Sequence, residues 1–448
     1  MKSNYIFPDS KEELPSAQRS EGVYIYDDKG KKYLDGSSGP MAVNLGHGNK
    51  EVTEAITNQM EKISFTYRSQ FTNQPLEILS KSIEKVTPKG LNKISFCNSG
   101  SEAAELALKM AHSYWKSQGK PLKIKIISRW HSYHGATLGA LSMSGIPSRR
   151  KEYSPYLNDY PNLELPYCFR CPYEKKYPQC DLFCARYLEK IINQMGAESI
   201  SAFIAEPFTG AAGAGISPPK GYFETIEKIC KDHEILLIID EVITGFGRTG
   251  KYFGSQHFDI TPDIITFGKG LSSGYAPLAG MIVSEEIYNS MKEVGGEYTT
   301  GHTFGGNPIS TAAGVAVMEV LSRNNLVEGV VSKGQFLGEQ LKKVLEDISI
   351  AVDLRGVGLL WGLEFAKSKE NNTPFEKEVN LTKRIVKACF NNGLIIYPSS
   401  GFIDGIIGDS ILISPPFIID ENEMMELARL LKQSLLQVEE ELSSTLTI

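Results

Sequence analysis

The middle of the chain alternates short apolar runs with stretches in which apolar residues recur every three to four positions. A short apolar run bounded by turn residues is typical of a strand buried on both faces, and the longer spacing is typical of a helix. The alternation therefore predicts an α/β domain built on a mostly parallel sheet. A helix is expected from Ala103 to Tyr114. The expected strands are 93–97, 123–128, 201–205, 235–239, 263–267 and 279–283.

The last third of the chain has a different order of elements. It contains two strand-like segments, 358–365 and 393–397, among four helical patterns. The expected helices are 307–323, 326–345, 376–391 and 420–442. We expect a smaller α+β domain here, joined by the N-terminal residues. The predicted organisation is a large domain over 50–305 and a small domain formed by 1–49 and 306–448.

Charge and composition exclude several classes of protein. The 448 residues carry a net charge of −6, and a mildly acidic chain is a poor candidate for binding nucleic acids or anionic membranes, which require basic surface. No apolar run approaches the roughly 18 residues of a membrane span, and residues 1–8 lack the apolar stretch of a signal peptide. We therefore expect a cytoplasmic protein with reduced cysteines and with neither nucleic acid nor membrane as a partner.

Two segments near predicted strand ends have the composition of ligand-binding turns. Residues 98–102 connect a strand to a helix, where free amides and the helix dipole form an anion site. A plain capped turn is the alternative. Tyr133, in the segment 130–135, follows another strand. Its ring can stack on a planar ligand or simply pack in the core.

Two charged residues end very apolar strands, where burial makes a charge costly. Asp240 has the chemistry to hold a protonated ring nitrogen of an electron-sink cofactor, and its alternatives are to cap the next helix or bind Mg²⁺. Lys269 stands between Gly268 and Gly270. In a cleft, desolvation would lower its pKa and make it a nucleophile able to form a Schiff base; otherwise it is a surface lysine in a turn.

The order and spacing of these segments resemble the class III (ω-amino-acid) aminotransferases of the fold type I, pyridoxal-phosphate-dependent superfamily. The resemblance covers nearly the whole chain. The matching motifs are 34–36, 44–47, 240–242, 245–250 and 303–308. It implies a large domain with a mostly parallel sheet of the seven-stranded type and a smaller α+β domain. It also implies pyridoxal phosphate as cofactor, an amine donor and a keto-acid acceptor as substrates, and a homodimer or dimer of dimers.

The resemblance assigns roles around the cofactor ring. Lys269 would bind the cofactor covalently and carry a proton between substrate and cofactor. Asp240 would pair with the pyridine nitrogen and keep it protonated. Tyr133 and Val242 would contact the two faces of the ring.

The resemblance also assigns the contacts farther from the ring. Gly100 and Ser101 would bind the phosphate, and Thr303 would reach the phosphate of the neighbouring subunit. Glu206 would support the site from behind. Two further arginines match family positions and are interpreted as structural: Arg248 and Arg355.

The sequence departs from relatives that use glutamate and 2-oxoglutarate. Those relatives carry arginines where this chain has Ala136 and Leu412, a glutamate at Ala211 and often a glutamine at Ile243. Loss of the arginines removes bidentate carboxylate contacts. The pattern favours pyruvate as acceptor and an ω-amine or ω-amino acid as donor. Three arginines are candidates for a replacement cation or for ordinary surface charge: Arg68, Arg149 and Arg150.

Four of the seven cysteines fall within an apparent insertion, 160–186. Cys168, Cys171, Cys180 and Cys184 form two close pairs, a pattern that suits tetrahedral binding of a structural zinc ion. Four reduced thiols are the alternative.

Two other functions stay open at this stage. The first is an aminomutase, racemase or epimerase, or amino-lyase that uses the same cofactor. The second is a non-catalytic binding protein that has kept the fold. The presence of Lys269, Asp240, Tyr133 and Ser101 together argues against the second.

Overall fold

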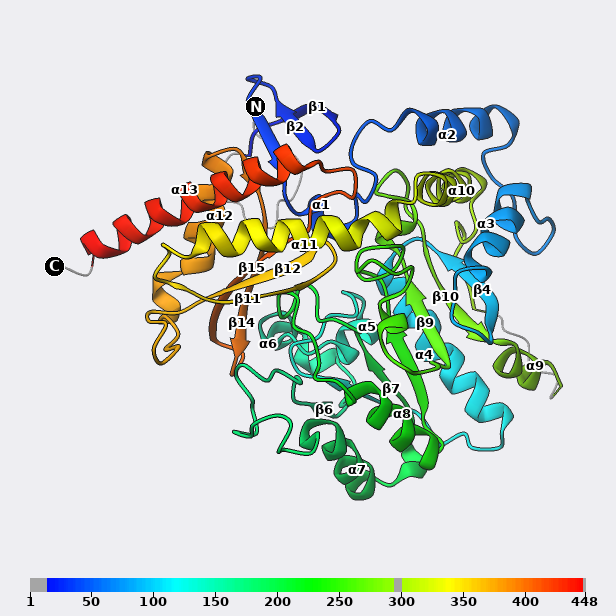
Figure 1. The fold of residues 1–448 in the computed structure, drawn as a ribbon. Helices are drawn as coiled ribbons and strands as arrows, with labels where there is room; N and C mark the ends of the chain where they lie inside the picture. Colours follow the sequence, from blue (N-terminus) through cyan, green and yellow to red (C-terminus); the bar gives the residue numbers. More distant parts are fainter. Residues whose placement is uncertain (1–13, 294–299, 446–448) are drawn as a thin grey trace.

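The structure, a computed structural model, describes residues 14–293 and 300–445 (Figure 1). A seven-stranded sheet with the order β4-β10-β9-β8-β7-β5-β6 forms its larger part. β10 is antiparallel to both of its neighbours, and the other pairs are parallel. The strands are β4 (Leu91–Cys97), β5 (Lys125–Arg129), β6 (Asn162–Leu163), β7 (Ile200–Ala205), β8 (Leu236–Asp240), β9 (Ile264–Phe267) and β10 (Ala279–Ser284).

The predicted α/β class with a mostly parallel seven-stranded sheet is confirmed. Each of the six expected strands exists, with ends within two residues of the expected ones. The strand β6 was missed because it has only two residues, too few for a pattern. β8 is buried along its whole length, as its unbroken apolar run predicts.

Helices cover both faces of this sheet (Figure 1). α4 (Gly100–Ser117) packs on β9 and β10 through small and medium apolar side chains, and α7 (Phe183–Met195) packs against α8 (Tyr222–Asp232). α10 (Pro308–Arg323) lies against α2 (Lys50–Lys62) and α3 (Gln74–Glu84). The shorter helices are α1 (Ser38–Met41), α5 (Leu138–Met143), α6 (Pro147–Arg150) and α9 (Glu285–Glu293).

The two ends of the chain share a small sheet with the order β1-β2-β3-β13. In it β13 (Leu394–Ile395) pairs in parallel with β3 (Lys32–Asp35), so N-terminal and C-terminal segments lie side by side. The other strands are β1 (Ala17–Glu21) and β2 (Tyr24–Asp27). The domain boundaries at 49/50 and 305/306 stay a prediction.

A second small sheet is antiparallel, with the order β11-β12-β15-β14. Three long helices accompany it, the longest forming the C-terminal end of the described chain (Figure 1). The strands are β11 (Ala351–Val357), β12 (Leu360–Phe365), β14 (Tyr397–Ile403) and β15 (Ile407–Ile413). The helices are α11 (Leu326–Leu345), α12 (Leu381–Asn391) and α13 (Glu421–Thr445).

Two sequence expectations in this region need correction. The segment 393–397 is not one strand, because the chain crosses from one sheet to the other between β13 and β14. The helix expected from 376 begins at Leu381, because Asn380 adopts a left-handed backbone conformation with φ of 51°. Such a residue interrupts a helical turn.

The predicted zinc site is not supported. Within the described ranges, no group of three or more His, Cys, Asp or Glu side chains is arranged to hold a metal ion. The four cysteines border one small cavity, but Cys168 is exposed while Cys184 is buried, so the thiols lie at different depths.

The cysteine-containing segment is held to the small sheet by a charged cluster instead. Tyr167 and Arg170 both contact the fully buried carboxylate of Glu364 on β12. Arg355 on β11 donates to Tyr167 Oη at 2.7 Å and to Asp353 at 2.6 Å. A buried carboxylate is tolerated only with such partners, so this cluster fixes the loop to the sheet. The contacts of Arg355 agree with its structural interpretation.

Among the described residues, we find no helix that is both long enough and apolar enough to cross a membrane.

Candidate active site

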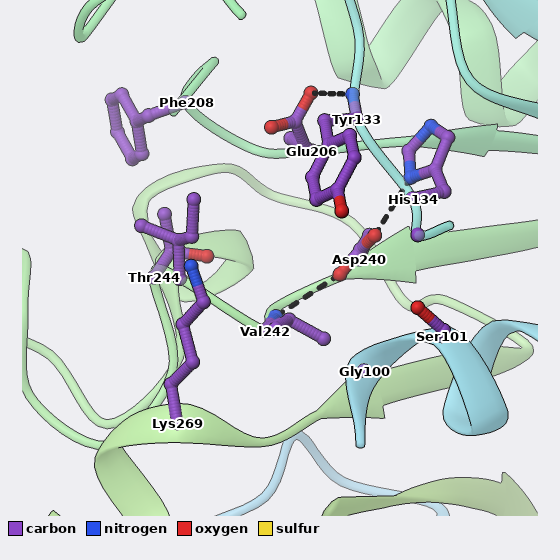
Figure 2. A pocket seen from close by; sticks show the side chains of 12 residues that line it. Gly100, Ser101, Tyr133, His134, Glu206, Phe208, Asp240, Val242, Thr244 and Lys269 are labelled. Carbon is purple, nitrogen blue, oxygen red and sulfur yellow. Dashed lines mark hydrogen bonds and ion pairs between the residues drawn. The ribbon is translucent and has the colours of Figure 1, made fainter. Parts of the chain in front are cut away.

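One cavity lies at the carboxyl ends of the central strands (Figure 2). Its walls come from the segments that follow β4, β5, β7, β8 and β9, the edge where α/β sheets bind ligands. The lining residues are Gly100, Ser101, Tyr133, His134, Gly135, Glu206, Phe208, Asp240, Val242, Ile243, Thr244 and Lys269.

Asp240 is a buried carboxylate with a fixed orientation. Its Oδ1 accepts a hydrogen bond from the Val242 amide at 3.0 Å, and its Oδ2 lies 2.7 Å from His134 Nδ1 (Figure 2). An ionised carboxylate only accepts hydrogen bonds, so the Nδ1 of His134 carries the proton in this pair. The two contacts fix the orientation of the Asp240 carboxylate at the end of β8.

Glu206 is a second buried carboxylate, but its environment differs. Burial raises its pKa, and the charge of Asp240 acts in the same direction, against His134 and Arg129. Its Oε2 accepts from the Tyr133 amide at 3.4 Å and its Oε1 from the Gly210 amide at 3.2 Å. Glu206 therefore fixes the loop that carries Tyr133, while its burial disfavours the charged form of its carboxyl group.

Lys269 follows β9 after one residue, Gly268, and enters the cavity from the opposite wall (Figure 2). Its backbone has φ of 40°, a left-handed conformation that an ordinary side chain seldom adopts. Such strain persists where the surroundings hold it, and it is frequent at functional sites. Burial lowers the pKa of Lys269 to about 8, against the opposing charges of Asp240 and Glu206. The amine is therefore a far better nucleophile than a surface lysine.

Two glycines at one end of the cavity leave room for an anion at the start of α4, because a side chain at either position would be too close to its neighbours. A Cβ on Gly100 would lie 2.9 Å from Val242 Cγ1, and one on Gly135 would lie 2.6 Å from Ser101 Oγ. Gly135 also has φ of 140°, which side chains rarely tolerate. Ser101 Oγ accepts from the Ala136 amide at 2.9 Å. This end joins a helix N-terminus, a hydroxyl and free space, as phosphate sites do.

A wall beside Lys269 is apolar. Phe208 and Ile243 of the cavity pack with the fully buried Leu412 of β15 and with Met41. A substrate carboxylate directed at this wall would meet no cation there. The wall suits a methyl or methylene group.

The cavity unites seven of the eight cofactor-contact residues expected from sequence: Gly100, Ser101, Tyr133, Glu206, Asp240, Val242 and Lys269. The eighth, Thr303, is exposed and lies outside the residues that line the cavity. Sequence reasoning missed His134 as a partner of Asp240. Two observations could have identified His134: it is adjacent to Tyr133, and a buried Asp240 needs a hydrogen-bond donor.

Comparison with known proteins identifies the family of this chain. The family model for class III aminotransferases matches residues 6–435. The chain belongs to the class III aminotransferases.

Two relatives and one solved structure illustrate the similarity. An uncharacterized aminotransferase, YodT, of Bacillus subtilis (strain 168) is 40% identical over 442 residues, covering 99% of each chain. The putrescine–pyruvate aminotransferase of Pseudomonas aeruginosa is 36% identical over 419 residues, covering 93% of this chain and 89% of its own. The crystal structure of a transaminase from the marine bacterium Virgibacillus has a TM-score of 0.92 at 34% identity, covering 98% of each chain.

Class III aminotransferases use pyridoxal phosphate, and the residues present here fit it. The space kept open by Gly100 and Gly135 accommodates a phosphate at the start of α4. The buried Asp240 supplies a negative charge for a ring nitrogen, and Lys269 supplies an amine of lowered pKa for an aldehyde.

Proposed function

We propose that this aminotransferase moves an amino group from an ω-amine or ω-amino acid to a keto acid, with pyruvate as the preferred acceptor. The observation that carries this proposal is the meeting of Lys269, Asp240 and Tyr133 in one cavity whose neighbouring wall is apolar. The reaction class follows from the family, and the substrate class follows from the wall.

We assign the residues around the ring as follows. When bound, pyridoxal phosphate supplies an electron sink for the carbon that carries the substrate's amino group. Lys269 Nζ would hold the cofactor and would accept the proton released from that carbon. Asp240, held in orientation by His134 and Val242, would keep a proton on the ring nitrogen. Tyr133 and Val242 would contact the two faces of the ring and exclude water.

The remaining polar groups position the cofactor. Gly100 and Ser101 receive the phosphate at the start of α4, where the amide groups and the helix dipole favour an anion. Glu206 holds the Tyr133 loop through its amide.

The apolar wall supports the choice of substrates. Leu412 and Ala136 stand where relatives specific for 2-oxoglutarate carry arginines, so the second carboxylate of that acceptor would lack a cation. Pyruvate has one carboxylate and a methyl group. The relative of Pseudomonas aeruginosa is named for a diamine donor and pyruvate, which fits the same pattern.

A second copy of the chain completes the phosphate site in this proposal. Thr303 is exposed, next to Phe304, whose ring lies 6.0 Å from that of Phe65. Several large apolar side chains of this region are exposed, which is typical of an interface. They are Phe65, Tyr67, Phe71 and Phe304. Sedimentation of the holoenzyme tests this assembly, and a monomer that retains full activity would contradict it.

The test of the reaction is a pair of half-reactions followed through the cofactor's absorbance. We expect an ω-amine to convert the cofactor from the aldehyde to the amine form, and pyruvate to restore it. A product formed without any change of cofactor form, and without a second substrate, would show a mutase, epimerase or lyase instead. A protein that takes up cofactor but responds to no amine or keto acid would be a binding protein.

A further inference from the structure

A substrate that carries a carboxylate needs a cation near the cavity, and the family's usual positions do not supply one. Leu412 is fully buried in an apolar cluster, and Ala136 has no charge. A carboxylate that loses its water must pair with a donor, most effectively an arginine fork.

Arg149 contacts the ring of Tyr133, one of the residues that line this cavity. It belongs to α6, and its guanidinium carbon stands over the ring of Tyr133, 4.6 Å from the ring centre. The side chain is exposed and makes no hydrogen bond or ion pair with any residue in the described ranges. A guanidinium that covers an aromatic ring keeps its in-plane N–H groups available for a carboxylate.

The charge of Arg149 also affects the pKa of Lys269 inside the cavity. Burial is the main cause of the lowered pKa of Lys269, and the positive charge of Arg149 acts in the same direction. Arg149 is therefore close enough to influence a charged group bound beside Lys269.

Other arginines near the cavity are already engaged. Arg150 donates Nη1 to the carbonyl oxygens of Leu141, Ser142 and Ser144 at 2.6–2.9 Å. Two more are fully buried and bound to carbonyl groups: Arg129, through Glu206, and Arg248, through Leu359 and Pro415.

Arg68 is the remaining rival. It is exposed, and its Nη1 donates to the Thr300 carbonyl at 3.2 Å. No ring or side chain of the cavity is among its contacts within the described ranges.

We propose that Arg149, held over Tyr133, is the cation that binds the distal carboxylate of an ω-amino acid and so determines substrate specificity. The inference rests on the proposed function and deepens it. Its chemistry is a bidentate charge-assisted contact beside Tyr133, on the side of the ring that Arg149 covers. An amine of equal length without the carboxylate would lack this contact.

The test compares matched probes on the holoenzyme. 4-Aminobutyrate and butylamine have the same carbon chain and differ in the carboxylate. The concentration for half-maximal rate of cofactor conversion is measured for both, and butyrate, which cannot react, is titrated by calorimetry.

We expect R149Q to raise the constants for 4-aminobutyrate and butyrate roughly ten- to hundredfold and to leave butylamine within about twofold. R149K should lie between R149Q and wild type, because an ammonium keeps the charge without the fork. The matched control, R68Q, should leave all three unchanged.

Three results would overturn the inference. R149Q could weaken both amines equally, which would mean that Arg149 only supports Tyr133. R68Q could cause the selective loss, which would assign the role to Arg68. The wild type could show neither affinity for butyrate nor preference for 4-aminobutyrate. If instead no amine converts the cofactor while butyrate binding still depends on Arg149, the proposed reaction fails and the carboxylate site stands.

Discussion

His134 Nδ1 lies 2.7 Å from Asp240 Oδ2, and both side chains are buried. The other oxygen of Asp240 accepts from the Val242 amide, so the carboxylate has a fixed orientation. His134 Nε2 has no hydrogen-bond partner among the described residues. The histidine therefore acts through a single bond, which stabilises the charge and the direction of Asp240.

We expect His134→Phe to lower the rate of cofactor conversion about ten- to hundredfold, the value of one lost hydrogen bond to a charged group. His134→Asn should recover part of this loss, because its amide can donate near the position of Nδ1. The readout that separates positioning from stability is the pH dependence of the cofactor's absorption spectrum. It should shift in His134→Phe and return toward wild type in His134→Asn. Equal spectra with lower thermal stability would mean that His134 only packs the core.

Asp240 itself is the subject of a second prediction. Asp240→Asn keeps the shape of the side chain and its contact with the Val242 amide but removes the negative charge. It should bind the cofactor and lose most transamination activity, because a neutral amide does not hold a proton on the ring nitrogen. Half-reaction rates measure the effect. Near-normal turnover would mean that another group protonates the ring.

The covalent link is tested on Lys269. Borohydride reduction of the holoenzyme should fix the cofactor to the peptide that contains Lys269. Lys269→Ala should lose transamination by several orders of magnitude, since both covalent attachment and proton transfer disappear. Peptide mapping identifies the modified residue, and label on another lysine would refute the assignment.

Features that depend on neighbouring residues could be predicted from the sequence, and contacts between distant residues could not. Lys269 and Asp240 end apolar strands, and the strand pattern alone brings those ends to one edge of the sheet. The pairing of His134 with Asp240 joins positions 106 residues apart, and no local pattern encodes it.

The anchoring of the cysteine-containing segment escaped prediction for the same reason. Tyr167 and Glu364 are 197 residues apart in sequence, so their contact exists only in the fold. The cysteine spacing was a strong local pattern, and it suggested a metal where the structure uses a buried carboxylate instead. The different contacts of two neighbouring arginines could not be predicted either. Arg149 stands over the Tyr133 ring, whereas Arg150 donates hydrogen bonds to backbone carbonyl groups, and the local sequence around the two is the same.

A pH prediction follows from the lowered pKa of Lys269. With a pKa of about 8 instead of 10.5, about one tenth of the amine is neutral at pH 7, against less than about one thousandth ordinarily. Uptake of cofactor by the cofactor-free protein should therefore speed up with pH and level off above about pH 8. Between pH 8 and 10.5 the unfolded chain binds more protons than the folded one at this residue, so its contribution to stability rises with pH. Stopped-flow uptake rates, with a model lysine amine as control, check the midpoint. A rise that continues to pH 10 would contradict the lowered pKa.

The choice of acceptor depends on how many carboxylates the site can pair. 2-Oxoglutarate brings two, and pyruvate brings one together with a methyl group. Leu412 is buried among apolar side chains and Ala136 is uncharged, so neither of the two positions at which the sequence comparison expects an arginine offers a donor here. Arg149 is one exposed cation and can serve one carboxylate. A charged hydrogen-bonded contact contributes about 1.5–3 kcal/mol, so the missing one disfavours 2-oxoglutarate roughly ten- to hundredfold.

We therefore expect pyruvate, or the similarly small glyoxylate, to be preferred over 2-oxoglutarate by at least about tenfold in kcat/KM. The measurement is the rate at which each keto acid restores the aldehyde form from the amine form of the cofactor. Ala136→Arg provides a gain-of-function control, because Ala136 is exposed and an arginine fits there without entering the core. It should raise the rate with 2-oxoglutarate and change that with pyruvate little. A wild-type preference for 2-oxoglutarate would show that two cations reach the site, and Arg68 together with Arg149 would be the pair to remove next.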